Sequence, residues 1–203
     1  MQVENHKEEV PFEHYREKFA ALDPAEAVAR LGVNFSDGEF AVRLLGVTYY
    51  IKHPGFAIRA DGDGLALHSL PAQTFLLRYL LEGKRTPATP EFKTFREMPW
   101  GELYVQPFTG RVLTRAAFTF GTRVEKFRAA AEKLGGLPLH HGDAAYEFDF
   151  LDNYRLRLIV WEGDEEFPPN AQLLYTANFA DGFAAEDRVV AGDLLISSLK
   201  MAM

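Results

Sequence analysis

The sequence predicts an α+β fold, in which helices pack on a mostly antiparallel sheet. Helical and strand-like periodicities occupy separate blocks of the chain, and short turn signals join the strand-like segments. In addition, 47% of the 203 residues are hydrophobic, including 17 Phe, 8 Tyr and 2 Trp. A chain of this size can bury about 70% of its unfolded surface. We therefore expect a single domain at residues 11–203, preceded by a flexible N-terminal tail at residues 1–10.

Three helices are expected in the first 85 residues. The first follows residue 10, because the aromatic residues of the stretch 12–19 share one helical face. The second begins at Asp23-Pro24, where the carboxylate can accept free amide protons and proline needs no donor, and it ends at Gly32. The third spans Pro71–Leu81, whose apolar residues cluster on one side.

An antiparallel meander is expected between the second and third helices. Residues 40–44 alternate in polarity, and residues 47–52 are β-branched and aromatic. Two further strands, residues 56–59 and 65–68, flank the Asp-Gly-Asp-Gly sequence at 61–64, which is a strong hairpin-turn signal.

The middle of the chain begins with its most linker-like stretch, Lys84–Pro90. Short strands are expected at Phe92–Met98 and Glu102–Val105. Helices are expected at Pro107–Phe120 and Thr122–Leu134, and the second of these opens with a Thr-Arg-Val-Glu capping-box pattern.

The last third returns to strands and closes with a helix. Strands are expected at 146–150, 154–161 and 171–176, and the final helix at Ala184–Lys200. The first of these strands alternates aromatic and acidic residues, and the second alternates apolar residues and arginines, so ion pairs are expected across the sheet. The residues of these pairs are Glu147 or Asp149 with Arg155 or Arg157.

The net charge of −7 is concentrated in one segment. Residues 143–187 contain eleven acidic and two basic residues, a net charge of −9, so the rest of the chain carries +2. The acidic balance disfavours nucleic-acid binding, since phosphate contacts need a basic face. We therefore expect no nucleic-acid partner, and the acidic segment is the candidate site.

The centre of this segment is Trp161–Pro169, with the sequence Trp-Glu-Gly-Asp-Glu-Glu-Phe-Pro-Pro. Close carboxylates repel, so they must be solvated, paired with arginine or helix amides, share a proton or hold a cation. One interpretation is a solvated turn, with a variant in which one carboxylate pairs with Arg96 or caps a helix. The other is a site for a divalent cation or a cationic ligand.

The candidate ligand-binding residues combine these carboxylates with an arginine and an aromatic side chain. Arg96 could grip an anionic ligand or neutralise the acidic turn, and Trp161 could belong to the core or stack on a planar ligand. No catalytic residue and no metal ligand is assigned, and His140-His141 is expected in an exposed loop. The candidates are Arg96, Glu97, Asp143, Trp161, Asp164, Glu165, Glu166, Glu186 and Asp187.

The compartment follows from cysteine content and apolar runs. Without cysteine the chain has no disulfide, no zinc–thiolate site and no iron–sulfur cluster of its own. The N-terminus lacks a signal-peptide pattern, and no apolar run reaches the roughly 18 residues of a membrane span. We expect a cytoplasmic protein with no membrane partner.

The chain resembles the prokaryotic family called domain of unknown function 3786. The most specific matching segment is Trp161–Pro168. The family carries no assigned activity. Some of its members look fused to a small four-cysteine iron–sulfur domain, which is similar to the domains found in corrinoid methyl-transfer proteins. The resemblance therefore implies only a loose association with corrinoid or iron–sulfur one-carbon metabolism. The other matching pieces are Asp23-Pro24, Gly46, Phe95-Arg96-Glu97, Phe108, Phe120-Gly121, Leu134-Gly135-Gly136, Gly142-Asp143-Ala144 and Glu186-Asp187.

The favoured function is a non-catalytic module that binds a small molecule or a basic protein partner around Trp161–Pro168. No cofactor is evident, and a divalent cation is a candidate ligand. The alternative is an enzyme that uses paired carboxylates as acid and base on an unknown substrate, with or without a divalent metal ion. A third interpretation is structural, with Arg96 and Glu186 holding the turn through buried ion pairs.

Overall fold

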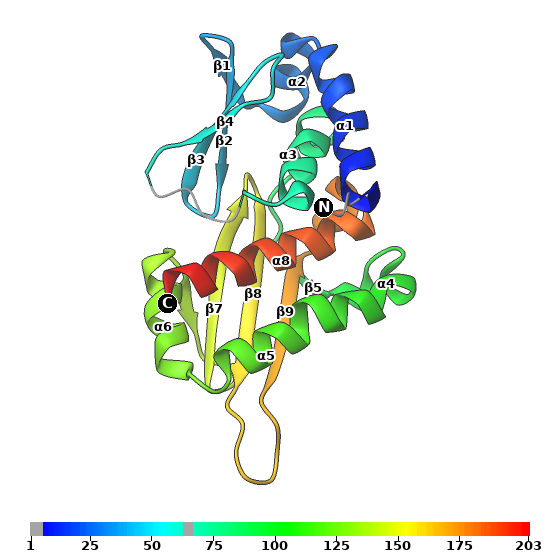
Figure 1. The fold of residues 1–203 in the computed structure, drawn as a ribbon. Coiled ribbons are helices and arrows are strands. Elements are labelled where there is room, and N and C mark those ends of the chain that lie inside the picture. Colours follow the sequence, from blue (N-terminus) through cyan, green and yellow to red (C-terminus); the bar gives the residue numbers. More distant parts are fainter. Residues whose placement is uncertain (1–5, 63–66) are drawn as a thin grey trace, which may run out of the picture. The chain divides into compact units, whose positions relative to one another are not determined.

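The computed structural model describes residues 6–62 and 67–203. The chain divides into two compact units, residues 1–85 and 86–203. The boundary falls within the linker-like stretch Lys84–Pro90. The α+β class and the antiparallel pairing are confirmed within both units (Figure 1). The arrangement as one domain stays a prediction.

The N-terminal unit combines helices with an antiparallel sheet of order β1-β2-β3-β4. The meander is confirmed for its first three predicted strands, and β1 is an additional strand. The first helix begins at His6, so residues 6–10 of the predicted tail are helical. The predicted turn at 61–64 and the strand at 65–68 lie partly outside the described residues. The elements are α1 (His6–Ala20), α2 (Pro24–Leu31), β1 (Asn34–Ser36), β2 (Glu39–Leu44), β3 (Val47–Lys52), β4 (Ile58–Ala60) and α3 (Leu70–Glu82).

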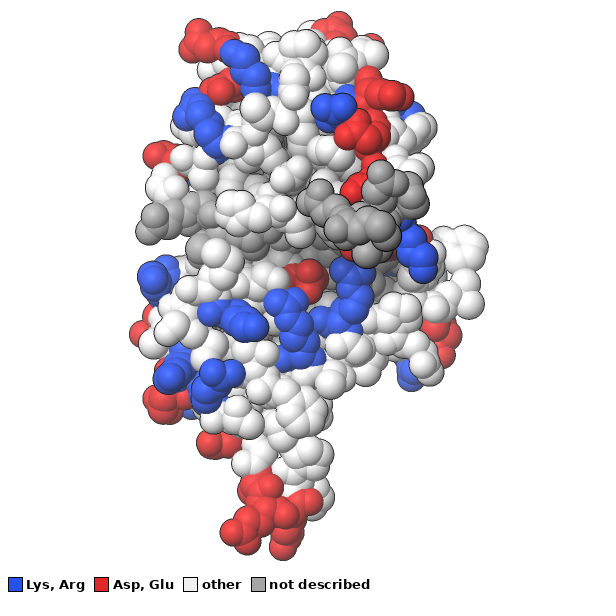
Figure 2. All heavy atoms as spheres, viewed as in Figure 1, with Lys and Arg blue, Asp and Glu red and all other residues white. Residues whose placement is uncertain are grey.

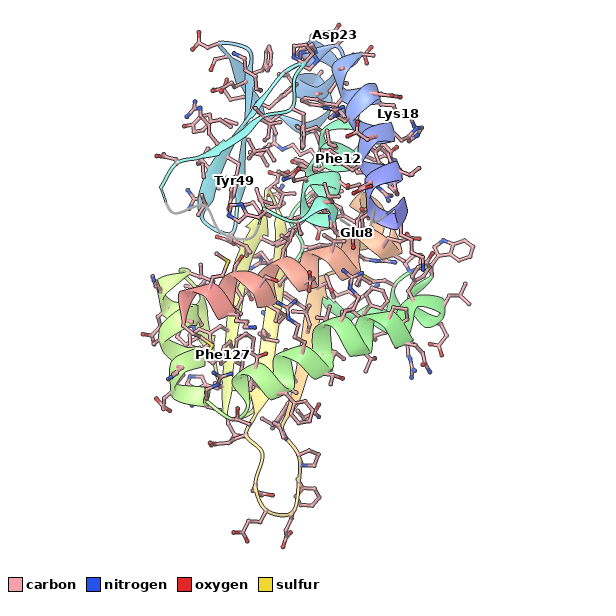
Figure 3. All side chains as sticks on the ribbon, in the orientation of Figure 1. Glu8, Phe12, Lys18, Asp23, Tyr49 and Phe127 are labelled. Carbon is pink, nitrogen blue, oxygen red and sulfur yellow. The ribbon has the colours of Figure 1, made fainter. Side chains whose placement is uncertain are left out.

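Aromatic side chains fill the core between α1 and the sheet. Phe19 of α1 is fully buried, and its ring centroid lies 5.9 Å from that of Phe40 and 5.6 Å from that of Phe56. Phe12, seven residues earlier on the same face of α1, has its ring centroid 5.8 Å from that of Phe56 (Figure 3). The aromatic face expected for the first helix is therefore the face that packs on the strands.

The ends of α2 and α3 are fixed by caps that the sequence indicates. The side chain of Asp23 accepts a hydrogen bond from the amide of Ala25 at 2.9 Å, and Gly32 ends α2 with a φ of 71°, which favours glycine. Arg30, in the last turn of α2, donates to the carbonyl of Leu80 at 2.7 Å. This bond satisfies one of the free carbonyls at the end of α3.

The C-terminal unit contains a sheet of order β6-β7-β8-β9-β5 with antiparallel neighbours. The strands at 146–150, 154–161 and 171–176 and the last helix are confirmed. The elements are β5 (Phe92–Thr94), the 3-10 helix η1 (Phe95–Glu97), α4 (Gly101–Phe108), the π-helix η2 (Thr109–Thr114), α5 (Arg115–Phe120), α6 (Val124–Lys133), β6 (Leu137–Leu139), β7 (Ala144–Leu151), β8 (Tyr154–Trp161), β9 (Asn170–Thr176), α7 (Phe179–Gly182) and α8 (Ala185–Ala202).

Helices α5 and α8 lie over one face of this sheet (Figure 1). Gly192 allows α8 to approach closely, because a Cβ there would stand 2.9 Å from a methyl group of Leu173 and 3.0 Å from the hydroxyl of Tyr175. At the β7 side, Phe127 of α6 points toward the sheet and its ring meets that of Tyr146 edge-on at 5.6 Å (Figure 3).

The opposite face of the sheet carries the predicted ion pairs. Glu147 is 7% exposed and accepts from Arg155 and, at 2.7 Å, from Arg157. The guanidinium of Arg157 also lies 3.7 Å from the ring centroid of Phe92. Asp149 faces Arg155 in register but is exposed and has no ion pair among the described residues. The prediction is thus confirmed for Glu147.

Three local predictions in the middle of the chain need correction. The strand predicted at Phe92–Met98 ends at Thr94, and residues 95–97 form the 3-10 helix η1. Residues 102–105 belong to α4 and form no strand; Phe108, at the end of this helix, stacks on Phe95 with centroids 4.2 Å apart. The capping box at the start of α6 does not form. Thr122 instead donates back to the carbonyl of Phe118. In the described part of the chain, no helix is long and apolar enough to cross a membrane.

Candidate functional site

The loop between β8 and β9, residues 162–169, carries the densest group of carboxylates and is called here the acidic loop. β8 ends at Trp161, which pairs with Asn170 at the start of β9. The acidic loop extends beyond this last strand pair (Figure 1), and its acidic side chains gather at its far end (Figure 2). The strand pairing therefore presents the motif at one end of the sheet.

The base of the acidic loop is anchored by backbone contacts. The carboxylate of Asp143 accepts the amide of Glu162 at 2.7 Å, and the amide of Gly163 donates to the carbonyl of Gly121 at 3.2 Å. Gly121 lies at the end of α5, and a Cβ there would stand 2.5 Å from Pro169 and 2.8 Å from the carbonyl oxygen of Trp161. The absence of a side chain at Gly121 lets the loop base rest directly on the helix end.

The tip of the acidic loop is a tight turn held by one carboxylate. The side chain of Asp164 accepts the amides of Phe167 at 2.7 Å and Glu166 at 2.8 Å, and its own amide donates to the carbonyl of Phe167 at 2.9 Å. The amides of Phe167 and then Glu166 hold the pKa of Asp164 below its ordinary value. The tip is thus pre-ordered, with Asp164 ionised at neutral pH.

The remaining glutamates and the phenylalanine of the acidic loop face solvent. Glu162, Glu165 and Glu166 are exposed, and Phe167 exposes 68% of its surface. None of the loop carboxylates forms an ion pair with residues 6–62 or 67–203. The structure therefore presents an exposed phenyl ring beside unpaired negative charges on an ordered turn.

The predicted residues Arg96, Glu97, Glu186 and Asp187 lie elsewhere. Arg96 and Glu97 follow β5, whose Thr94 pairs with Leu174 in the second half of β9. The two acidic residues begin α8, which follows the C-terminal end of β9. The acidic loop precedes the opposite end of the same strand (Figure 1). The structure does not bring the nine predicted residues together.

Each residue of this second group has a local role. Arg96 forms an exposed ion pair with Glu102 at 3.0 Å, so the predicted pairing of Arg96 with the acidic turn is wrong. Glu97 accepts from the amide and hydroxyl of Thr94, both at 2.7 Å, and the hydroxyl, then the amide, lower its pKa. Glu186 accepts from the hydroxyl of Tyr104.

Asp187 and Trp161 complete the predicted set. Asp187 is 7% exposed beside Arg188, whose guanidinium is almost fully buried and donates to the carbonyl of Pro99. Burial lowers the pKa of Arg188. Trp161 is half-buried at the end of β8. Neither residue contributes to the exposed tip of the acidic loop.

Sequence reasoning missed Phe167 as part of the site. Its position between two glutamates and two prolines was the available signal, because a bulky apolar residue in such a turn has few buried neighbours to pack against. It also missed Gly121, whose role depends on a contact 48 positions away in sequence, with Pro169. No local pattern reveals that contact.

The exposed arrangement limits the chemistry that the acidic loop supports. An acid–base pair needs carboxylates in a pocket, where desolvation can raise a pKa, whereas these carboxylates are exposed and Asp164 has a lowered pKa. Within the described residues, no group of three or more acidic or histidine side chains is placed to hold a metal ion. The geometry is suited to docking a cationic surface.

Comparison with known proteins gives one match. A family model described as Domain of unknown function (DUF3786) matches residues 23–198. Comparisons with curated proteins and with solved structures found no significant match.

Proposed function

We propose that this chain, which belongs to the DUF3786 family of domains of unknown function, is a non-catalytic module that docks a basic protein partner on its acidic loop. The observation that carries the proposal is the exposed Phe167 beside the exposed carboxylates of Asp164, Glu165 and Glu166, which form no ion pair with any residue that the structure describes. A partner segment with lysine or arginine residues around an apolar pocket would complement both features.

The order of the acidic loop supports docking. A flexible loop loses conformational entropy when it binds, and a pre-ordered loop avoids much of that cost. The two amide bonds to Asp164 and the contact of Gly121 with the loop base hold this loop before any partner arrives. A small exposed anionic tip is expected to give a modest affinity that falls with added salt, because exposed charges are screened beyond about 10 Å at 0.1 M.

The class of partner follows from the family association and the composition. Because these 203 residues contain no cysteine, an iron–sulfur cluster in the same process would be held outside them. The association with corrinoid and iron–sulfur one-carbon metabolism suggests that a polypeptide holding such a cluster is the partner. A cytoplasmic location is part of this proposal.

The proposal is tested with peptides selected against the full chain. Peptides from a random displayed library are enriched on the wild-type protein, and one enriched peptide is measured by calorimetry against variants. We expect enriched peptides to be basic. Glu165→Gln with Glu166→Gln should weaken binding by about 3- to 10-fold, and Phe167→Ala by at least about tenfold.

The matched control is Glu8→Gln with Glu9→Gln, which removes the same number of charges from an adjacent acidic pair on α1. This variant should bind the peptide like the wild type. Enrichment of acidic or neutral peptides, or equal losses in the control and the loop variant, would overturn the proposal. Calorimetry with Mg²⁺ and Ca²⁺ distinguishes a cation site, since saturable heat that disappears in the loop variant would assign the acidic loop to a metal.

A further inference from the structure

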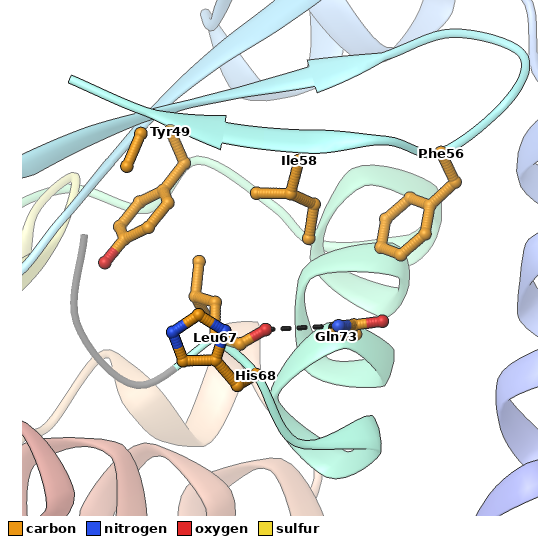
Figure 4. A pocket seen from close by; sticks show the side chains of 7 residues that line it. Tyr49, Phe56, Ile58, Leu67, His68 and Gln73 are labelled. Carbon is orange, nitrogen blue, oxygen red and sulfur yellow. Dashed lines mark hydrogen bonds between the residues drawn. The ribbon is translucent and has the colours of Figure 1, made fainter.

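The hollow between β3, β4 and the start of α3 does not define a ligand. Tyr49 and Ile58 line it from the strands (Figure 4), but His68 at its edge is exposed and the hollow is open to solvent. Leu67, which also lines it, directly follows residues 63–66, which lie outside the described ranges. A better defined surface lies in the C-terminal unit, at the start of α4.

An exposed apolar stripe runs along α4. Trp100, which directly precedes the helix, and Leu103 each leave 71% of their surface exposed, and Pro107, four residues after Leu103, is also exposed. Residues three and four apart share one side of a helix, whereas the buried residues Gly101 and Phe108 face the core. Trp100, Leu103 and Pro107 are called here the α4 stripe.

The turn that presents Trp100 is held in a strained conformation. Trp100 has a φ of 62°, in the left-handed region that bulky residues rarely adopt. The carbonyl of Pro99, the preceding residue, accepts from the buried guanidinium of Arg188. Gly101, the following residue, has no room for a Cβ, which would collide with the carbonyl oxygen of Phe95. The backbone at Trp100 is therefore fixed before any contact forms, which lowers the entropic cost of that contact.

Charges of both signs border the α4 stripe. Arg96 and Glu102 form an ion pair at 3.0 Å, and their side chains are 64% and 71% exposed. Glu102 lies in the first turn of α4, and the Cα of Arg96 would stand 3.0 Å from a Cβ at Gly101. An exposed pair of this kind contributes little to stability, so both side chains are available to a second molecule. A partner with one sign of charge would meet a like charge here, whereas a second copy related by a two-fold axis brings the opposite sign to each group.

We propose that the α4 stripe mediates a two-fold contact between two copies of this chain, with Arg96 of each copy beside Glu102 of the other. Trp100 and Leu103 offer on the order of 300 Å² of apolar surface per copy, against about 800 Å² per partner in a standard interface. The dimer is therefore weak and reversible, with a dissociation constant on the order of 0.1–1 mM. The contact leaves the acidic loop free, because that loop leads into the first residue of β9, whereas Arg96 follows β5, which pairs with the second half of β9. This proposal does not rest on the docking of a basic partner.

The experiment measures the self-association of the full chain by sedimentation equilibrium at protein concentrations up to about 1 mM. We expect a monomer–dimer equilibrium for the wild type. Trp100→Ala should weaken dimerisation at least about tenfold, because it removes the aromatic anchor from both copies. Phe118→Ala is the matched control, since Phe118 of α5 is 58% exposed but lies outside the α4 stripe. This variant should dimerise like the wild type.

Charge reversal tests the two-fold arrangement without changing Trp100. Arg96→Glu leaves two acidic groups at the contact and Glu102→Arg leaves two basic groups, so each variant alone should dimerise at least about tenfold more weakly than the wild type. In an equimolar mixture of the two variants each reversed charge meets its opposite, so the heterodimer should form within about threefold of the wild-type affinity. Circular dichroism checks that each variant is folded, as expected for changes at exposed positions. The proposal would be overturned by a wild type that stays monomeric up to about 1 mM, by equal dimerisation of Trp100→Ala and the wild type, or by a mixture that associates no more strongly than its separate components.

Discussion

Replacement of Gly121 by alanine tests whether the acidic loop is held in place by the end of α5. The backbone of Gly121 has a φ of −71° and a ψ of −7°, which alanine adopts without strain. The new Cβ, however, would stand 2.5 Å from the Cβ of Pro169 and 2.8 Å from the carbonyl oxygens of Ala117 and Trp161. Ordinary contacts between carbon atoms begin near 3.5 Å, so Pro169 must move by about 1 Å.

The cost of this overpacking is about 1–3 kcal/mol. In a chain of this length a loss of 1 kcal/mol lowers the melting temperature by about 2–4 °C, so Gly121→Ala should melt roughly 2–12 °C below the wild type. Hydrogen exchange should also accelerate at the amides of Gly163, Glu166 and Phe167, because their hydrogen bonds form only while the base of the acidic loop is packed against the end of α5.

Gly110→Ala is the matched control, because a Cβ at Gly110 meets nothing within 4 Å. Gly110 lies within η2, so alanine there should leave stability unchanged or raise it by up to about 1 kcal/mol. The reasoning would be refuted if Gly121→Ala melted with the wild type and its loop amides exchanged at the wild-type rate.

Two further changes test the charges of the C-terminal unit. Glu147→Gln should lower the free energy of unfolding by about 1–3 kcal/mol in urea denaturation, because one charged partner of Arg155 and Arg157 is lost from a buried position. The exposed neighbour gives the control: Asp149→Asn should stay within about 0.5 kcal/mol, and an equal loss in both variants would contradict this account. Because the folded-state pKa of Asp164 is lowered, its contribution to loop order is complete above the unfolded value of 3.8 and is lost as pH falls through the folded pKa. The two amides that its side chain accepts should therefore exchange faster only below pH 3.8, and unchanged protection once NMR shows the carboxylate to be protonated would show that it does not hold the turn.

Local chemistry made much of the fold predictable. The Asp23 cap and Gly32 define α2 because both signals act within a few residues. The alternation of β7 and β8 places Glu147 opposite Arg157, since the two strands are adjacent in sequence and joined by a short turn. In these cases the residues that form the contact are close in sequence, so the local pattern is enough to predict it.

The predictions were wrong where contacts between residues far apart in sequence determine the secondary structure or the position of a side chain. The run Glu102–Val105 is too short for its periodicity to separate strand from helix, and the helix is fixed by the packing of Gly101 and Phe108 on Phe95. Likewise, the sequence separation between Arg96 and the acidic loop says nothing about distance. Strand order places them at opposite ends of β9, and Arg96 pairs with Glu102 instead.

The central claim, that the acidic loop docks a basic partner, is tested most directly by a hydrogen-exchange footprint of the full chain with an enriched basic peptide. The account predicts new protection at residues 162–169 that diminishes in 0.5 M salt and in the Phe167→Ala variant. Protection confined to other residues, with the loop exchanging as in the free protein, would contradict the claim.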